Sequence, residues 1–238
     1  MAEIPLLEVS TIETCYGLSQ VLFGLSLRIA PGEMVTLMGR NGMGKTTTVR
    51  SIMGLTPAIA GSIRFAGEEI RDVPSYRVAQ LGIGLVPEGR QIFPNLTARE
   101  NLVATAANRG AVPDPWTLDK VCALFPRLAE RRRNGGNQLS GGEQQMLTIG
   151  RALMTNPDLI LIDEATEGLA PLVAQEIWRT IARIRAEGVA TVIVDKDFRA
   201  LSRIADKAMI LSKGEIVFEG PPAELAAKRE LLERHLGV

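Results

Sequence analysis

Gly39-Arg-Asn-Gly-Met-Gly-Lys45-Thr46 carries the spacing of a Walker A phosphate loop. In such a loop, glycines let the backbone approach a triphosphate closely, and a lysine and a hydroxyl complete the set of donors. The apolar run Met34–Met38 leads into this segment, and Thr46–Met53 has helical character. Strand, glycine-rich loop and helix are the order that a true phosphate loop requires. The segment therefore predicts a nucleoside triphosphate site within an α/β fold.

Each part of the loop has an expected role. The backbone amides from Gly42 to Thr46 are expected to surround the β-phosphate, next to the positive end of the following helix. Lys45 is expected to reach the β- and γ-phosphates, the Thr46 hydroxyl to bind Mg²⁺, and Thr47 to contact the α-phosphate. The nucleotide-binding residues predicted in this segment are Gly39, Asn41, Gly42, Met43, Gly44, Lys45, Thr46 and Thr47.

A second element supplies acidic partners for the phosphate loop. Leu159–Ile162 is a short apolar run typical of a buried strand, and Asp163 and Glu164 follow at its exit. Asp163 is predicted to hold Mg²⁺ through water, and Glu164 to polarise the attacking water as a general base. A strand that merely ends in an acidic turn is the alternative. It is disfavoured because this run follows a phosphate loop in the expected order.

The overall composition limits the class of protein. The 238 residues are expected to form one domain, and 27 basic and 27 acidic side chains give a formal net charge of zero. A neutral chain has no overall field that would gather nucleic acid, so nucleic acid is not an expected partner. Cys15 and Cys122 have no metal-ligand spacing and match a reduced, cytoplasmic protein.

Targeting and membrane-spanning signals are not apparent in the sequence. Met1–Pro5 lacks the basic end and the apolar stretch of a signal peptide. No apolar run approaches the ~20 residues that are needed to cross a bilayer. Any role at a membrane is therefore expected to be that of a peripheral subunit.

The chain is expected to fold as two lobes of a single domain, residues 1–238. Residues 1–87 and 157–238 are predicted to form an α/β core, and residues 88–156 a helical lobe inserted into it. Strands separated by helices imply that the sheet is largely parallel. The core elements expected after the phosphate loop are strands at 61–65, 159–162, 190–194, 208–211 and 216–218, and a helix at 172–186; a further strand is expected before it at 21–29.

Three helices are predicted in the inserted lobe, at Thr97–Ala107, Leu118–Arg133 and Gly141–Met154. Thr97 and Glu100 have the spacing of a capping box, which marks a helix start. Two glycines between residues 134 and 137 are expected to form a flexible break before the third helix.

No common structural element explains the run Leu139-Ser-Gly-Gly-Glu-Gln-Gln145. Together with the phosphate loop and the acidic pair, this run makes the chain resemble the ATP-binding cassette (ABC) ATPases over nearly its whole length. In those proteins such a signature run caps the γ-phosphate of ATP held by a second subunit. The resemblance implies a RecA-like P-loop NTPase core with an antiparallel β subdomain and an inserted helical subdomain.

The resemblance also implies that the signature run acts on a partner's nucleotide. Ser140–Gly142 looks like a helix N-cap with two bare amides, and the serine hydroxyl and the glycine amides would point at a γ-phosphate. The arrangement would be a head-to-tail dimer with two interfacial ATP sites, formed either by two copies or by two different ATPases. The residues implied to contact nucleotide in this way are Ser140, Gly141, Gly142 and Glu143.

Further positions take their expected roles from the resemblance. Tyr16 stands where ABC ATPases stack an aromatic ring on adenine, although a lone tyrosine is more often ordinary packing. Glu88 stands where most of them carry a glutamine that senses Mg²⁺ and the membrane partner, so it is implied to contact nucleotide and metal. Val86–Arg90 and Glu167–Pro171 resemble one subgroup, the second ATPase subunit of branched-chain amino-acid importers. Ala165 is a minor departure, since proline is usual there.

Lys196 is a larger departure from the family pattern. ABC ATPases usually carry a histidine at this place that contacts the γ-phosphate, and the branched-chain subgroup often lacks it. Lys196 is therefore expected to act as the catalytic substitute, in a site that is implied to be the weaker of two. The alternative is a solvated lysine with no role. The single histidine, His235, is expected at the surface rather than in catalysis.

The resemblance implies an ATP- and Mg²⁺-dependent subunit that powers an importer for branched-chain or related amino acids. It would lie on the inner face of the cell membrane with a second ATPase subunit and two permease subunits, and act indirectly with an extracytoplasmic substrate-binding protein. One alternative is an ATPase for another transport system, such as lipopolysaccharide export. Another is a soluble ABC ATPase outside transport. It is disfavoured because those chains usually carry coiled-coil insertions, zinc ligands or two cassettes.

Overall fold

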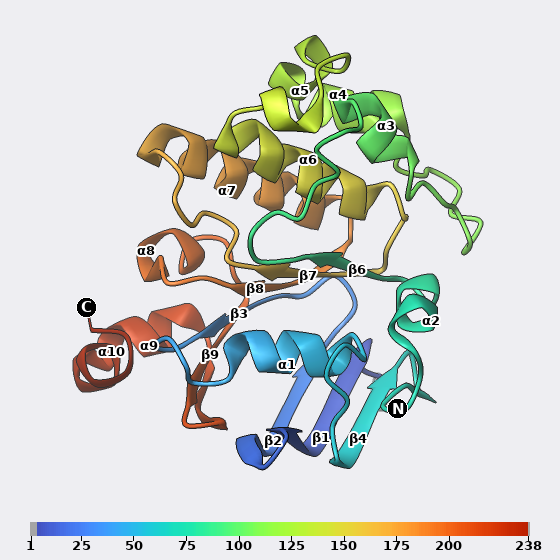
Figure 1. Cartoon of the computed structure of the whole chain (residues 1–238). Coiled ribbons are helices and arrows are strands. Elements are labelled where there is room, and N and C mark those ends of the chain that lie inside the picture. The colour runs from blue at the N-terminus through green and yellow to red at the C-terminus, as the bar shows by residue number, and fades with distance from the viewer. Residues whose placement is uncertain (1–3, 238) are drawn as a thin grey trace.

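The computed structural model describes residues 4–237, which form two β-sheets with helices packed against them (Figure 1). Residues 1–3 lie outside the described residues. They belong to the segment Met1–Pro5, which is not expected to be part of a signal peptide. The strands are β1 (Leu7–Tyr16), β2 (Ser19–Ile29), β3 (Met34–Met38), β4 (Ala60–Phe65), β5 (Glu68–Glu69), β6 (Ile83–Val86), β7 (Leu159–Asp163), β8 (Ala190–Val194), β9 (Lys207–Ser212) and β10 (Glu215–Gly220).

The larger sheet has the strand order β10-β9-β3-β8-β7-β6, and five of its strands run parallel. β10 pairs antiparallel with β9. β3, β7 and β8 are buried along their whole length, as expected for parallel strands covered on both faces. The carboxyl ends of these three strands meet at one edge. The phosphate loop, the acidic pair and residues 195–197 follow those ends and are therefore brought together.

The smaller sheet is antiparallel and has the order β2-β1-β4-β5. α1 (Lys45–Ile52) lies between the two sheets, whereas α6 (Gly141–Leu153) and α7 (Pro171–Ala186) cover the opposite face of the larger sheet (Figure 1). The side chains of β3 alternate between these two faces of the larger sheet. Val35 and Leu37 pack into the cluster beside α1, and Met34 and Met38 into the cluster beside α6 and α7.

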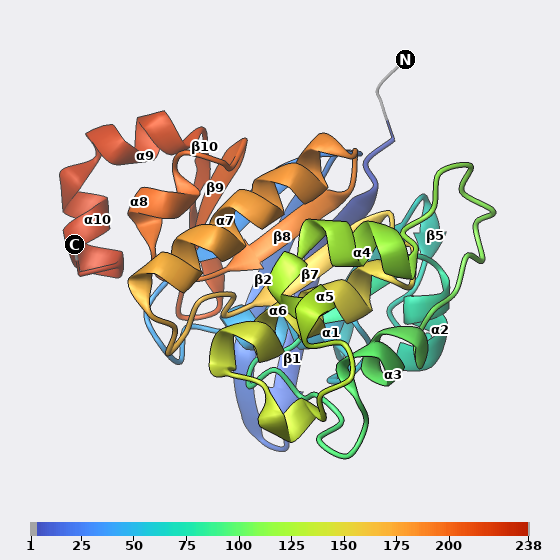
Figure 2. The same ribbon diagram turned by 90° about the horizontal axis from the view of Figure 1, so that it is seen from above.

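The remaining helices are short. Figure 2 shows α3 and α4 on the far side of the molecule from the C-terminal helices α9 and α10. Among the described residues, no helix has the length and apolar character to cross a membrane. These helices are α2 (Ser75–Gln80), α3 (Ala98–Val103), α4 (Leu118–Leu124), α5 (Pro126–Glu130), α8 (Phe198–Leu201), α9 (Pro222–Ala227) and α10 (Arg229–His235), with a 3₁₀ turn at Gly136–Gln138.

Two predicted helices are wrong in extent. The helix expected over Leu118–Arg133 is broken into α4 and α5, because Phe125 has non-helical backbone angles and Pro126 starts a new helix. The helix expected over Thr97–Ala107 ends at Val103. Its start is as predicted, since Thr97 and Glu100 form the reciprocal hydrogen bonds of a capping box.

Candidate active site

The phosphate loop needs its glycines for steric reasons. Gly42 and Gly44 have positive φ angles of 78° and 105°, which residues with a Cβ rarely adopt. A Cβ on Gly44 would lie 2.8 Å from the Leu22 side chain, and one on Gly39 would collide with the carbonyl oxygen of Leu211. The loop therefore packs tightly against the strands behind it while its other side remains available for a ligand.

Lys45 opens α1 and is held over the loop. Its Nζ donates to the carbonyl oxygens of Gly39, at 2.8 Å, and Arg40, at 3.0 Å. Burial lowers the pKa of this ammonium, and the charges of neighbouring carboxylates, Glu164 first, partly oppose that effect. A buried cation bound only by neutral carbonyls is well placed to exchange them for phosphate oxygens.

Asp163 ends β7 and is 2% exposed. Its Oδ1 is buried without a hydrogen-bond partner among the described residues. Burial raises the pKa of this carboxyl, and a hydrogen bond with the Thr46 hydroxyl opposes the rise. An orphaned carboxylate oxygen beside a hydroxyl is the donor set that Mg²⁺ prefers, so Asp163 and Thr46 fit a magnesium ion.

Glu164 follows Asp163 directly and has a positive φ of 56°. Its backbone amide donates to the carbonyl oxygen of Val194, at 2.8 Å, on the neighbouring strand. A hydrogen bond with Glu167 is the largest cause that raises the pKa of Glu164 to about 7, followed by burial and nearby carboxylate charges. One oxygen each of Glu88, Glu164 and Glu167 lies within 4.8 Å of the others. A carboxylate with a pKa near neutrality has the basicity that suits a general base.

Glu167→Ala should lower the pKa of Glu164, because both the hydrogen bond and the like charge that raise it are removed. Glu164 would then stay ionised at lower pH. We expect the acidic limb of the kcat/KM profile, which reports the free enzyme, to move to lower pH. The exposed Glu130→Ala provides the control. An acidic limb in the same position for Glu167→Ala and the parent would exclude this coupling.

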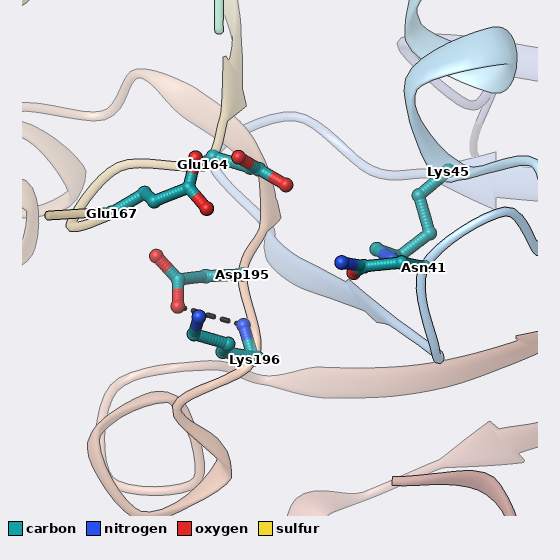
Figure 3. Close-up of a pocket in the computed structure, with 6 residues that line it drawn as sticks. All are labelled: Asn41, Lys45, Glu164, Glu167, Asp195 and Lys196. Atoms are coloured by element: carbon teal, nitrogen blue, oxygen red, sulfur yellow. Dashed lines mark hydrogen bonds between the residues drawn. The ribbon is translucent and has the colours of Figure 1, made fainter. Parts of the chain in front are cut away.

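A pocket at the same edge of the sheet is lined by residues from three loops (Figure 3). Glu164 and Glu167 lie together on one side, and Asn41 and Lys45 of the phosphate loop lie across from them. Asp195 and Lys196 close the pocket from the exit of β8. The predicted residue Lys196 therefore does lie beside the predicted base and the phosphate loop.

Tyr16 ends β1 close to the first turn of α1 and is 46% exposed. Burial alone would raise the pKa of its hydroxyl, but hydrogen bonds with Thr47 and Thr56 and the charge of Arg50 lower it overall. An exposed ring beside Thr47 is available for stacking. Glu88 lines both of the cavities that Thr46 lines.

The signature run forms the start of α6. Ser140 is the N-cap: its amide donates to the Glu143 carboxylate, at 2.7 Å, and the Glu143 amide donates to its hydroxyl, at 3.3 Å. The Glu143 carboxylate and amide thus form the capping box that starts α6. Two cavities lie at the phosphate loop, and their lining among the described residues includes no residue of the segment 140–143.

Sequence reasoning missed two acidic residues of the site, Glu167 and Asp195. Glu167 entered only as part of a subgroup motif, and its contact with Glu164 depends on how the loop folds back. Asp195 follows the buried strand Ala190–Val194, as Asp163 ends its neighbour. The rule that parallel strands present their carboxyl ends at one edge could have identified it.

Comparison with known proteins gives a consistent result. The family profile described as ABC transporter matches residues 22–167. The chain is 40% identical to the high-affinity branched-chain amino acid transport ATP-binding protein BraG of Pseudomonas aeruginosa, over 98% of this chain and 100% of that protein. It is 32% identical to the lipopolysaccharide export system ATP-binding protein LptB of Escherichia coli K12, over 97% of each.

Solved structures agree with the fold. An ATP-binding subunit of an ABC transporter has a TM-score of 0.81 at 28% identity, covering 95% of this chain and 94% of that one. The dimeric cassette MJ0796, bound to ADP and phosphate in a post-hydrolysis state, has a TM-score of 0.77 at 26% identity, covering 91% and 98%. This similarity confirms the predicted fold class.

Proposed function

Because the chain belongs to the ABC transporter family of ATP-binding proteins, and is an ATPase, we propose that it powers an importer for branched-chain or related amino acids. The catalytic part of the proposal rests on one observation: Lys45 follows β3, Asp163 and Glu164 lie at the end of β7, and these strands pair with the two sides of β8, so the three residues come to one edge of the sheet. The similarity to BraG supports the substrate class, since the match spans the full length of both proteins.

The hydrolytic roles follow from the geometry. Lys45 would leave its carbonyl partners for the β- and γ-phosphates. Thr46 and Asp163 would hold Mg²⁺, which neutralises charge on the phosphates, with Glu88 beside them. Glu164 would accept a proton from the attacking water, and Tyr16 would offer its ring to the adenine.

Two such subunits are proposed to close head to tail around two ATP molecules. The support within this chain is the signature run, whose capped helix start is absent from the lining of its own phosphate-loop cavities among the described residues. The amides at this end of α6 would then bind the γ-phosphate held by the partner. The partner is either a second copy or a different ATPase.

Ser140→Arg should abolish hydrolysis while leaving ATP affinity at this chain's own phosphate loop unchanged. The arginine would occupy the place of the partner's γ-phosphate. Ser140→Ala separates the two effects of this change: it removes the hydroxyl and its helix cap, at about 1 kcal/mol of unfolding free energy, but it adds no cation. ATP affinity of the isolated chain and ATPase activity of the dimer are the two measurements. Loss of affinity in the isolated Ser140→Arg chain would contradict the head-to-tail arrangement.

A groove beside the site is proposed to receive the membrane subunits. Leu55 and Phe93, each 43% exposed, line a hollow of about 740 Å³ together with Pro87 and Leu85. Thr46, Glu88 and Asp163 also line this hollow. A cytoplasmic helix of a permease with an apolar face would fit this groove, and its movement would act directly on the metal-binding residues. The chain is accordingly proposed to lie peripherally on the inner face of the membrane.

Lys196→His should raise hydrolysis at this chain's site. A histidine offers a directional donor to the γ-phosphate, whereas lysine is a mobile, strongly hydrated charge, and positioning dominates phosphoryl transfer. In a dimer whose partner's general base is disabled, turnover reports this site alone. Lys228→His, a surface change, is the control. An unchanged or lower rate would show that Lys196 does not limit the site.

Transport by a reconstituted assembly tests the substrate class. The chain would be purified with its permeases, and ATP-dependent uptake of labelled leucine into vesicles would be measured against that of an unrelated amino acid. The second candidate is lipopolysaccharide export, favoured by the 32% identity to LptB. ATPase activity that responds to lipopolysaccharide and not to leucine would favour this candidate.

A further inference from the structure

Asp195 is a buried carboxylate whose bonds are all made within the protein. It is 6% exposed and follows β8 directly. Its Oδ2 accepts hydrogen bonds from the amide of Thr166, at 3.1 Å, and from the Thr166 hydroxyl, at 2.9 Å. Its Oδ1 accepts from the amides of Lys196, at 2.7 Å, and Asp197, at 3.1 Å. Both oxygens therefore have two donors each.

Asp195 differs from the other carboxylates of the site because both of its oxygens already accept hydrogen bonds from the chain. Among the described residues, the buried Oδ1 of Asp163 has no hydrogen-bond partner, and Glu164 points into the pocket beside Glu167. Asp195 lines the same pocket, but its oxygens are occupied by donors of the chain. It is therefore suited neither to bind a metal ion nor to accept a proton from water. Its geometry suits holding two loops together.

The loop that Asp195 holds contains the general base. Glu164 has a φ of 56°, a left-handed conformation that costs a residue with a Cβ about 1 kcal/mol or more unless its surroundings impose it. Three hydrogen bonds to the end of β8 and to Asp195 impose it here. The Val194 carbonyl oxygen accepts from the amide of Glu164, and the Asp195 carboxylate binds Thr166 two residues later. Ala165, between them, is fully buried.

We propose that Asp195 is the positioning residue of the hydrolytic site: it clasps Thr166 and thereby fixes the direction of the Glu164 carboxylate. Its second oxygen fixes the backbone of Lys196, so both walls of the pocket are set by one side chain. The proposal rests on the proposed roles of Glu164 and the phosphate loop. It adds a residue whose carboxylate oxygens are already occupied by donors of the chain.

Asp195→Asn tests the clasp with little change in shape. An amide offers one accepting oxygen, so its NH₂ group would face the donors on one side of the clasp, at Thr166 or at the Lys196 and Asp197 amides. We expect kcat for ATP hydrolysis to fall by about tenfold to hundredfold, the scale of a misplaced catalytic group, with the ATP dissociation constant unchanged. Asp197→Asn is the control, because that neighbouring carboxylate only caps α8 and asparagine caps equally well.

A double variant shows whether Asp195 acts through the base. Single-turnover hydrolysis by Asp195→Asn/Glu164→Gln should equal that of Glu164→Gln alone, since there is no base left to position. Thr166→Val, which removes one bond of the clasp, should give a smaller loss of kcat and provides a second variant if Asp195→Asn does not fold. Parental kcat in both single variants, or a further loss in the double variant, would overturn the proposal. A parent without ATPase activity would instead overturn the site itself.

Discussion

Lys45→Ala should abolish productive ATP binding. The Lys45 ammonium lies over the phosphate loop, and its two present hydrogen bonds are to the neutral carbonyl oxygens of Gly39 and Arg40. Charge-assisted hydrogen bonds are worth about 1.5–3 kcal/mol each, so losing two should weaken binding at least about a hundredfold. Titration with a fluorescent ATP analogue measures the change.

The control for this substitution is Lys228→Ala. That lysine is exposed and pairs with Glu224 on the C-terminal helices, far from the phosphate loop in sequence. The same side-chain truncation there should leave ATP affinity unchanged. If Lys45→Ala and Lys228→Ala bound the nucleotide equally well, the phosphate-loop assignment would be wrong.

Glu164→Gln should retain ATP and slow hydrolysis by about 10²–10⁴, the usual contribution of a general base. The amide keeps the size of the side chain but cannot take a proton from the attacking water. Because ATP then stays bound longer, the closed dimer should accumulate. Single-turnover hydrolysis and sedimentation with ATP and Mg²⁺ measure the two effects.

Glu130→Gln provides a matched control, because that carboxylate is exposed on α5. It should hydrolyse ATP at the parental rate. A parental rate in Glu164→Gln as well would remove Glu164 as the base and direct attention to Glu167, whose carboxylate lies next to it.

The sequence predicted the fold well where buried strands carry motifs. Met34–Met38 and Ala190–Val194 were placed without error, because short apolar runs bounded by turns have little freedom in a parallel sheet. The inserted helices were less predictable. Leu118–Arg133 has a helical composition, but Pro126 outweighs it by removing one hydrogen bond from the helix.

The site shows a similar limit. Motifs predict which residues should bind a triphosphate, and the structure brings Lys45, Asp163 and Glu164 to one edge of the sheet. Asp195 belongs to no recognised motif, and its role depends on contacts with Thr166, 29 positions away. Contacts between loops that are distant in sequence depend on tertiary structure. They could not be inferred from local patterns.

Complementation between two inactive variants tests the shared-site dimer most directly. Lys45→Ala keeps an intact signature run, and Ser140→Arg keeps an intact phosphate loop. Under conditions in which the parental chain hydrolyses ATP, each variant alone should be inactive. A mixed head-to-tail dimer contains one intact site, so an equal mixture should recover up to about a quarter of the parental activity. An inactive mixture, with mixed dimers shown to form, would contradict a site built from two subunits.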